Sequence, residues 1–142
     1  MRRPLVPIDG SPACGRALAH VLAELQAVGG ACVHLLHVQA PLIEPWPGKL
    51  VSPDMVRDEL VQRGRAVLAA HEAAVRTAGV ECCSHVRIGA FTADEIAACA
   101  AEQGCDAIVM GTRGLGRMAG LVLGSVATGV VHKSSVPVTL VK

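Results

Sequence analysis

The chain has 142 residues, with 13 basic and 12 acidic side chains and a formal net charge of +1. Hydrophobic residues make up 51% of it but aromatic residues only 1%, so the core must be aliphatic. A neutral balance and so few rings disfavour nucleic-acid binding, which relies on basic patches and base stacking. The length fits one compact domain over residues 1–142.

The compartment is predicted from the apolar segments and the cysteines. The opening MRRPLVPIDG has too short an apolar stretch for a signal peptide, and no segment approaches the roughly 18 apolar residues of a membrane span. We therefore expect a cytoplasmic protein with no membrane partner. The six cysteines form no C-x-x-C pair, and we expect reduced, buried thiols.

Strand and helix signals alternate along the first half of the chain. Pro7 lacks an N–H donor, which places it at the end of its strand. Ser11 followed by Pro12, and Ser52 followed by Pro53, are typical of helix starts. The predicted elements, in chain order, are a strand at 5–9, a helix at 12–28, a strand at 32–38 and a helix from about 52 to 78.

The second half continues the alternation. Thr92 and Glu95 have the spacing of a capping box and predict the start of a third helix. The expected elements are a strand at 80–88 near the sheet edge, a helix at 92–104, a strand at 107–110, a helix at about 125–133 and a last strand at 136–142. Five strands alternating with four helices predict a single-domain α/β fold, an open parallel sheet with helices on both faces.

A ligand site is expected where the carboxyl ends of two central strands meet. Ligands of open parallel sheets bind beyond those ends, at the point where the strand order reverses. If the first and fourth strands flank that point, Asp9 and Gly111 lie on its two sides. A carboxylate such as Asp9 can accept hydrogen bonds from ribose hydroxyls.

The stretch GTRGLGRMAGLVLGSV, residues 111–126, follows the fourth strand. Gly111 and Gly114 would let the backbone approach a ligand closely and admit a positive φ. Gly124 and Ser125 open a helix whose unpaired N–H groups favour an anion, and the Ser125 hydroxyl could cap the helix or donate to a phosphate. Arg113 and Arg117 add positive charge.

Two interpretations of this glycine-rich stretch compete. It matches neither the P-loop nor the dinucleotide fingerprint, and the glycine spacing alone favours a flexible connection and a phosphate site equally. Asp9 at the neighbouring strand end favours the phosphate site.

The sequence resembles the universal stress protein family. The resemblance rests on VPIDGS near the start, LLHV in the second strand, the pattern G-2x-G-9x-G-S from Gly111 to Ser125, and the final VPVTLV. It implies the strand order 3-2-1-4-5 of the adenine nucleotide alpha hydrolase-like fold, and it implies the branch of the family that binds ATP, with or without Mg²⁺.

The resemblance also implies the roles of individual residues. Asp9 would hold the ribose, and Val38 would contact adenine through its backbone. The phosphates would be cradled by Gly111, Gly114, Gly124 and Ser125. The same pocket would be lined less specifically by Pro7, Ile8, Met110, Arg113 and Val126.

A homodimer is a further implication of the resemblance. An apolar edge strand invites pairing unless another chain covers it, and two copies of VPVTLVK could pair antiparallel about a two-fold axis. The residues expected at this interface are Val136, Val138 and Leu140.

We expect no metal site and no catalytic residue. His34 and His37 are three residues apart on a strand and therefore point to opposite faces. The other histidines and the serines have no acid, base or nucleophile at a spacing that indicates a catalytic site. The leading hypothesis is an ATP-binding stress-response switch or sensor. The alternatives are a slow ATPase or nucleotide-transferring enzyme of the same fold, and an interaction module with a purely structural loop.

Overall fold

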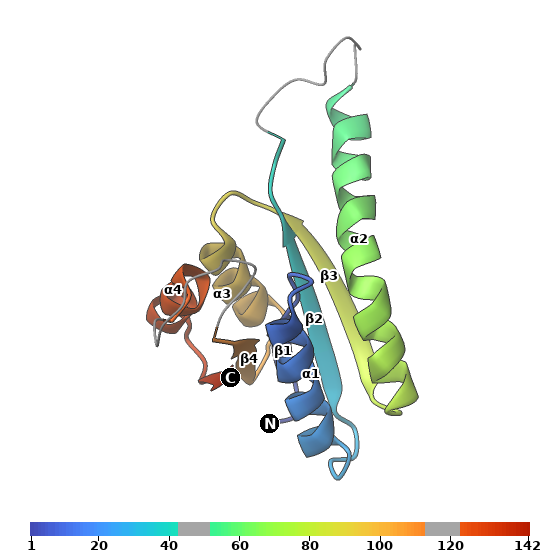
Figure 1. Ribbon diagram of the computed structural model, residues 1–142, viewed down its shortest axis with the longest axis vertical. Helices are drawn as coiled ribbons and strands as arrows, with labels where there is room; N and C mark the ends of the chain where they lie inside the picture. Colours follow the sequence, from blue (N-terminus) through green and yellow to red (C-terminus); the bar gives the residue numbers. More distant parts are fainter. Residues whose placement is uncertain (43–51, 113–122) are drawn as a thin grey trace.

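The computed structural model describes residues 1–42, 52–112 and 123–142. Strands and helices alternate along these residues, as the sequence predicts (Figure 1). The elements are β1 (Pro4–Pro7), α1 (Pro12–Leu25), β2 (Cys32–Gln39), α2 (Pro53–Thr77), β3 (Glu81–Ile88), α3 (Thr92–Glu102), β4 (Ala107–Gly111), α4 (Ser125–Lys133) and β5 (Val138–Val141).

The five strands form one parallel sheet in the order β3-β2-β1-β4-β5, which confirms the predicted fold. β1 lies at its centre, where Leu5 pairs with His34 of β2 and with Ile108 of β4. Pro7 is the last residue of β1, as its missing N–H donor requires. The chain order reverses between β1 and β4, so the switch point of the sheet lies between these two strands.

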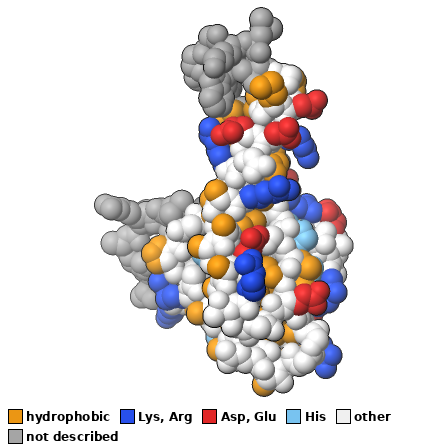
Figure 2. All heavy atoms as spheres, turned by 90° about the vertical axis from the view of Figure 1, so that its right-hand side faces the viewer, with side chains coloured by type: hydrophobic (Ala, Val, Ile, Leu, Met, Phe, Trp, Pro, Cys, Tyr) orange, Lys and Arg blue, Asp and Glu red, His pale blue; other side chains and the backbone are white. Residues whose placement is uncertain are grey.

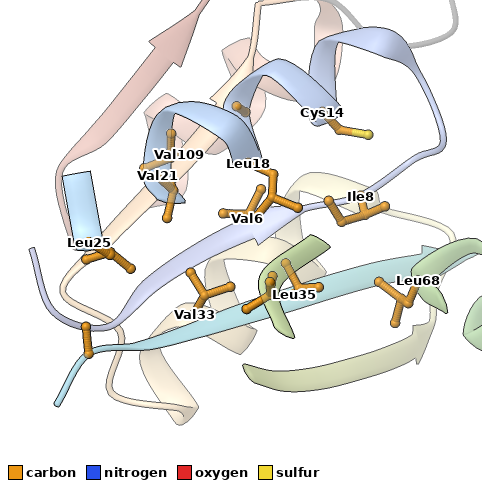
Figure 3. Packing of buried hydrophobic residues seen from close by; sticks show 13 residues of the cluster. Val6, Ile8, Cys14, Leu18, Val21, Leu25, Val33, Leu35, Leu68 and Val109 are labelled. Carbon is orange, nitrogen blue, oxygen red and sulfur yellow. The ribbon is translucent and has the colours of Figure 1, made fainter. Parts of the chain in front are cut away.

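Helices cover both faces of the sheet, α1 and α2 on one side and α3 and α4 on the other (Figure 1). Successive side chains of β1 point to opposite faces of the sheet. Val6 packs among the residues of α1 (Figure 3), whereas Leu5 belongs to the cluster under α3 and α4. Among the described residues, the two core clusters consist of Val, Leu, Ile, Ala and Met with several cysteines, and they contain no aromatic residue.

Two of the three predicted helix caps are confirmed. Ser11 and Ser52 are the N-caps of α1 and α2, and their side chains accept hydrogen bonds from the third helical N–H. The capping box at Thr92 is wrong, because the N-cap of α3 is Phe91 and no side chain caps it. The carboxylate of Glu95, which would have closed the box, instead accepts a hydrogen bond from Arg87 of β3 at 3.4 Å.

α2 is the longest helix, and its amino-terminal turns extend beyond the sheet (Figure 1). Lys and Arg side chains alternate there with Asp and Glu side chains on the surface in Figure 2. This matches the sequence RDELVQRGR, residues 57–65, in which every charged residue is exposed. Among the helices that the structure describes, none is long and apolar enough to cross a membrane.

Candidate functional site

The end of β1 presents a carboxylate at the switch point. The Ile8 N–H donates to the Leu36 carbonyl of β2 at 2.8 Å, which carries the sheet one residue past β1. Asp9 follows and is exposed, and its Oδ1 accepts a hydrogen bond from the Ser11 N–H at 2.9 Å. Asp9 forms no ion pair with any residue that the structure describes, so its other carboxylate oxygen can accept a bond from a ligand.

The start of α4 is hydrogen-bonded directly to the end of β4. The Gly124 N–H donates to the Thr112 carbonyl at 3.0 Å, and the Thr112 N–H donates to the Val141 carbonyl of β5 at 3.0 Å. Gly111 and Gly124 are separated by twelve intervening residues in the sequence, yet this bond brings them to the same edge of the sheet. Thr112 is therefore a candidate site residue that the sequence analysis did not single out.

No side chain of the described residues caps the amino-terminus of α4. Its N-cap is Gly124, with φ −60° and ψ 151°, so Ser125 is the first helical residue and does not cap the helix. Thr128 N–H closes the first turn on the Gly124 carbonyl at 2.9 Å. Within the described ranges, the N–H groups of Ser125, Val126 and Ala127 have no partner, and the helix dipole makes this end attractive to an anion.

Gly111 does not need a positive φ, contrary to the sequence-based expectation. The described glycines with positive φ are Gly10, Gly30, Gly79 and Gly104. Gly111 is instead required by packing, because a Cβ built on it would meet the Cβ of Ala13 at 2.5 Å. Its lack of a side chain therefore brings β4 against the first turn of α1, just beyond Asp9.

The remaining expected site residues differ in what they offer a ligand. Ile8 and Met110 are core residues with 2% and 7% of their surface exposed. Pro7 and Val38 are half-buried at the ends of their strands. Arg113 and Gly114, like Arg117, lie outside the described residues.

His37 also lies at this edge and was not predicted to contribute. Its Nδ1 donates to the Ile8 carbonyl at 2.8 Å, next to Asp9. His37 faces α2 while His34 faces the opposite layer, as their spacing predicts. The available signal was its place directly before Val38, at the end of a strand that neighbours β1.

The fold and this edge define a class of protein. The central strand β1 is followed by the exposed carboxylate of Asp9. Beside β1, the residue after β4 is hydrogen-bonded to the amino-terminus of α4, and both features lie at the switch point of an open parallel sheet. This is the arrangement of open parallel α/β proteins, whose ligands bind at the switch point of the sheet. Within that class, the chain belongs to the universal stress protein family, whose sequence model matches residues 1–142.

Similar proteins agree with this assignment. A universal stress protein of Thermus aquaticus, encoded 3′ of a sulfhydrylase gene, is 36% identical over 138 residues, which cover 97% of this chain and 96% of the relative. The structure of the hypothetical protein MJ0577 superposes with a TM-score of 0.82 at 26% identity, covering 99% of this chain and 95% of the other. The universal stress protein of Archaeoglobus fulgidus in complex with dAMP gives a TM-score of 0.72 at 26% identity, covering 100% and 98%.

Proposed function

We propose that this protein binds an adenine nucleotide, ATP, at the edge formed by β1, β4 and α4, and acts as a nucleotide-dependent switch or sensor in a stress response. The observation that carries the proposal is the hydrogen bond from Gly124 N–H to the Thr112 carbonyl, which joins the start of α4 to the end of β4 beside Asp9. The complex of the Archaeoglobus relative with dAMP supports an adenine nucleotide as the ligand class.

The phosphate groups are assigned to the start of α4. Three consecutive N–H groups, from Ser125 to Ala127, point out of an uncapped helix end, and the Ser125 hydroxyl is exposed beside them. The Gly124 N–H is engaged with Thr112, so Gly124 contributes space for the phosphates and not a donor. We further propose that Gly114 and Arg113, from the connection to β4, complete the phosphate contacts.

The ribose is assigned to Asp9. The bond from Ser11 N–H to Oδ1 orients the carboxylate and leaves Oδ2 to accept from a sugar hydroxyl. Because dAMP lacks the 2′-hydroxyl, the complex of the Archaeoglobus relative with dAMP indicates that this hydroxyl is not required for binding in that relative. The adenine is assigned to the backbone near Val38, with Pro7 beside it at the end of β1.

Calorimetry with a matched pair of variants tests the site. Wild-type protein, Asp9→Ala and the control Asp58→Ala, which changes an exposed carboxylate on α2, are titrated with ATP, ADP and AMP, with and without Mg²⁺. We expect Asp9→Ala to weaken ATP binding by about 1 to 3 kcal/mol, the cost of losing hydrogen bonds to a charged acceptor. Asp58→Ala should bind like the wild type.

Deoxynucleotides sharpen the ribose assignment. If Asp9 binds the sugar, 3′-deoxy-ATP should lose affinity for the wild-type protein but not for Asp9→Ala, which has already lost that contact. Equal losses in both proteins would place the ribose elsewhere. No ATP binding by the wild type, together with no nucleotide released from the purified protein by acid, would contradict the proposed function itself.

We also propose that the protein is a homodimer formed by antiparallel pairing of β5. The Pro137 carbonyl accepts from Ile108 N–H of β4, and the Val141 carbonyl accepts from Thr112 N–H directly after β4. By strand alternation, the N–H and C=O groups of Val138 and Leu140 therefore point away from β4. The side chains of Val136, Val138 and Leu140 pack against the core under α3 and α4, which leaves backbone groups as the main pairing surface.

Analytical ultracentrifugation tests the dimer. The wild type should sediment as a dimer at micromolar concentration, and Val138→Pro, which removes one outward N–H from an edge strand, should shift the protein towards the monomer. Thermal melting of both proteins checks that the variant is folded. A wild-type monomer at all concentrations would contradict the proposal.

A further inference from the structure

Two C-x-H triplets lie side by side on neighbouring strands. Cys32 and His34 belong to β2, and Cys83 and His85 belong to β3. Residues two apart on a strand share a face, and the pairing of His34 with Cys83 sets the two triplets against each other. All four side chains therefore lie on one face of the sheet, the layer of α3 and α4, opposite to the face of Val33 and Leu35.

The side chains of this cluster are in direct contact. The sulfur atoms of Cys32 and Cys83 are 3.2 Å apart, and His34 Nδ1 is 3.1 Å from His85 Nε2. Cys32, His34 and Cys83 each provide one atom that could bind a metal, and these three atoms lie within 4.8 Å of one another. Cys32 and His34 are 8% and 2% exposed, whereas Cys83, on the edge strand, is half-buried.

Hydrogen bonding determines which nitrogen of His34 is unprotonated. Arg3 Nη2 can only donate, and it lies 3.4 Å from His34 Nε2, so Nε2 accepts. The proton is then on Nδ1 and is donated to His85 Nε2.

We propose that Cys32, Cys83 and His34 bind a thiophilic cation of the Zn²⁺ type through their two Sγ atoms and Nε2. Thiolate and neutral imidazole are the ligands that Zn²⁺ prefers, and three protein ligands leave the fourth tetrahedral position to water. His85 is a positioning residue, because a ligating histidine commonly donates its other N–H to an outer partner that orients the ring.

Binding requires two local changes. Arg3 gives up its bond to His34 Nε2 and retains the one from Nη2 to the Gln103 carbonyl at 2.9 Å. Both thiols lose their protons to solvent as the metal–sulfur bonds form. A disulfide between the two cysteines would use the same sulfurs but would give no role to His34.

Cobalt and zinc titrations test the site in the full-length, reduced, metal-free protein. Co²⁺ reports thiolate ligands by its sulfur-to-metal charge-transfer absorption, and competition with a chromophoric chelator gives the Zn²⁺ affinity. The ligand variants are Cys32→Ser, Cys83→Ser and His34→Gln. The matched control is Cys82→Ser, which changes the neighbouring cysteine on the opposite face, packed against the other core cluster.

We expect the wild type and Cys82→Ser to take up one equivalent of metal with a thiolate signature. Mutation of a residue that only hydrogen-bonds to a metal ligand typically weakens metal binding by about 10- to 100-fold. Each ligand variant should weaken Zn²⁺ binding by more than this. Cys83→Ser is on the half-buried edge strand, so it keeps the test valid if a buried variant fails to fold.

Three results would overturn the proposal. The first is the absence of a thiolate–cobalt band in the reduced wild type. The second is an equal loss of affinity in Cys82→Ser and Cys83→Ser. The third is metal binding that is unchanged in all three ligand variants.

Discussion

Gly111 at the end of β4 lies against Ala13 in the first turn of α1, so closely that a Cβ on Gly111 would be 2.5 Å from the Ala13 Cβ and 3.0 Å from its carbonyl carbon. One contact thus links the strand that precedes the glycine-rich segment to the helix that follows Asp9. The two sides of the candidate nucleotide site are therefore held together by close packing of Gly111 on Ala13.

Gly111→Ala should therefore destabilise the protein. Ala13 belongs to a helix and its backbone cannot yield freely, so we expect a loss of about 1 to 3 kcal/mol, as for other overpacked cores. Chemical denaturation measures it. The control is Gly15→Ala, two residues after Ala13 in α1. A Cβ on Gly15 meets nothing within 4 Å, so this substitution should stabilise the helix by up to about 1 kcal/mol. Two variants of equal stability would contradict this account.

Gly64→Ala should also destabilise the protein, because Gly64 lies at the contact between α2 and β3. A Cβ there would be 2.5 Å from Val86 Cγ1 and 3.2 Å from His37 Cδ2. The gain in helix propensity, about 1 kcal/mol, is smaller than the expected overpacking cost of about 1 to 3 kcal/mol. The double variant with Val86→Ala tests the cause: if the clash is responsible, Gly64→Ala should cost less in that background.

Ser11→Ala should lower the stability of the protein more than Ser52→Ala, although both serines cap a helix. Ser11 is buried, and its Oγ accepts from Cys14 N–H at 3.4 Å, whereas Ser52 is exposed and water can replace its bond to Met55 N–H. Loss of an N-cap costs about 0.5 to 2 kcal/mol, and we expect Ser11 near the upper end by thermal melting. ATP affinity should not change, because Asp9 binds the main-chain N–H of residue 11.

Asp106→Ala should loosen the start of β1. The Asp106 carboxylate accepts hydrogen bonds from the main-chain N–H groups of Arg2 and Arg3, the latter at 3.1 Å. These groups are exposed, so water partly replaces the lost bonds and we expect a loss of about 1 kcal/mol. Asp106→Asn keeps one acceptor oxygen and should lose less. Hydrogen exchange at Arg3 gives a local readout that should accelerate in Asp106→Ala.

Local signals explain which sequence predictions succeeded. Ser11 and Ser52 precede prolines at the first helical position, and both helices begin there because the cap and the fixed φ act within a few residues. The same reasoning failed at Thr92, where Glu95, the residue that would close a capping box, instead accepts a hydrogen bond from Arg87 of β3.

The sequence by itself determined the alternation of elements, the parallel sheet and the edge at which Asp9 and Gly111 meet, since apolar periodicity and turn residues act over short distances. Only the tertiary structure decided what those residues contact. It placed Thr112 against Gly124, explained Gly111 by Ala13, and set the triplet of Cys32 and His34 beside that of Cys83 and His85. Each of these contacts joins residues that are far apart in the sequence, or on different elements, and that meet only when the elements pack against one another.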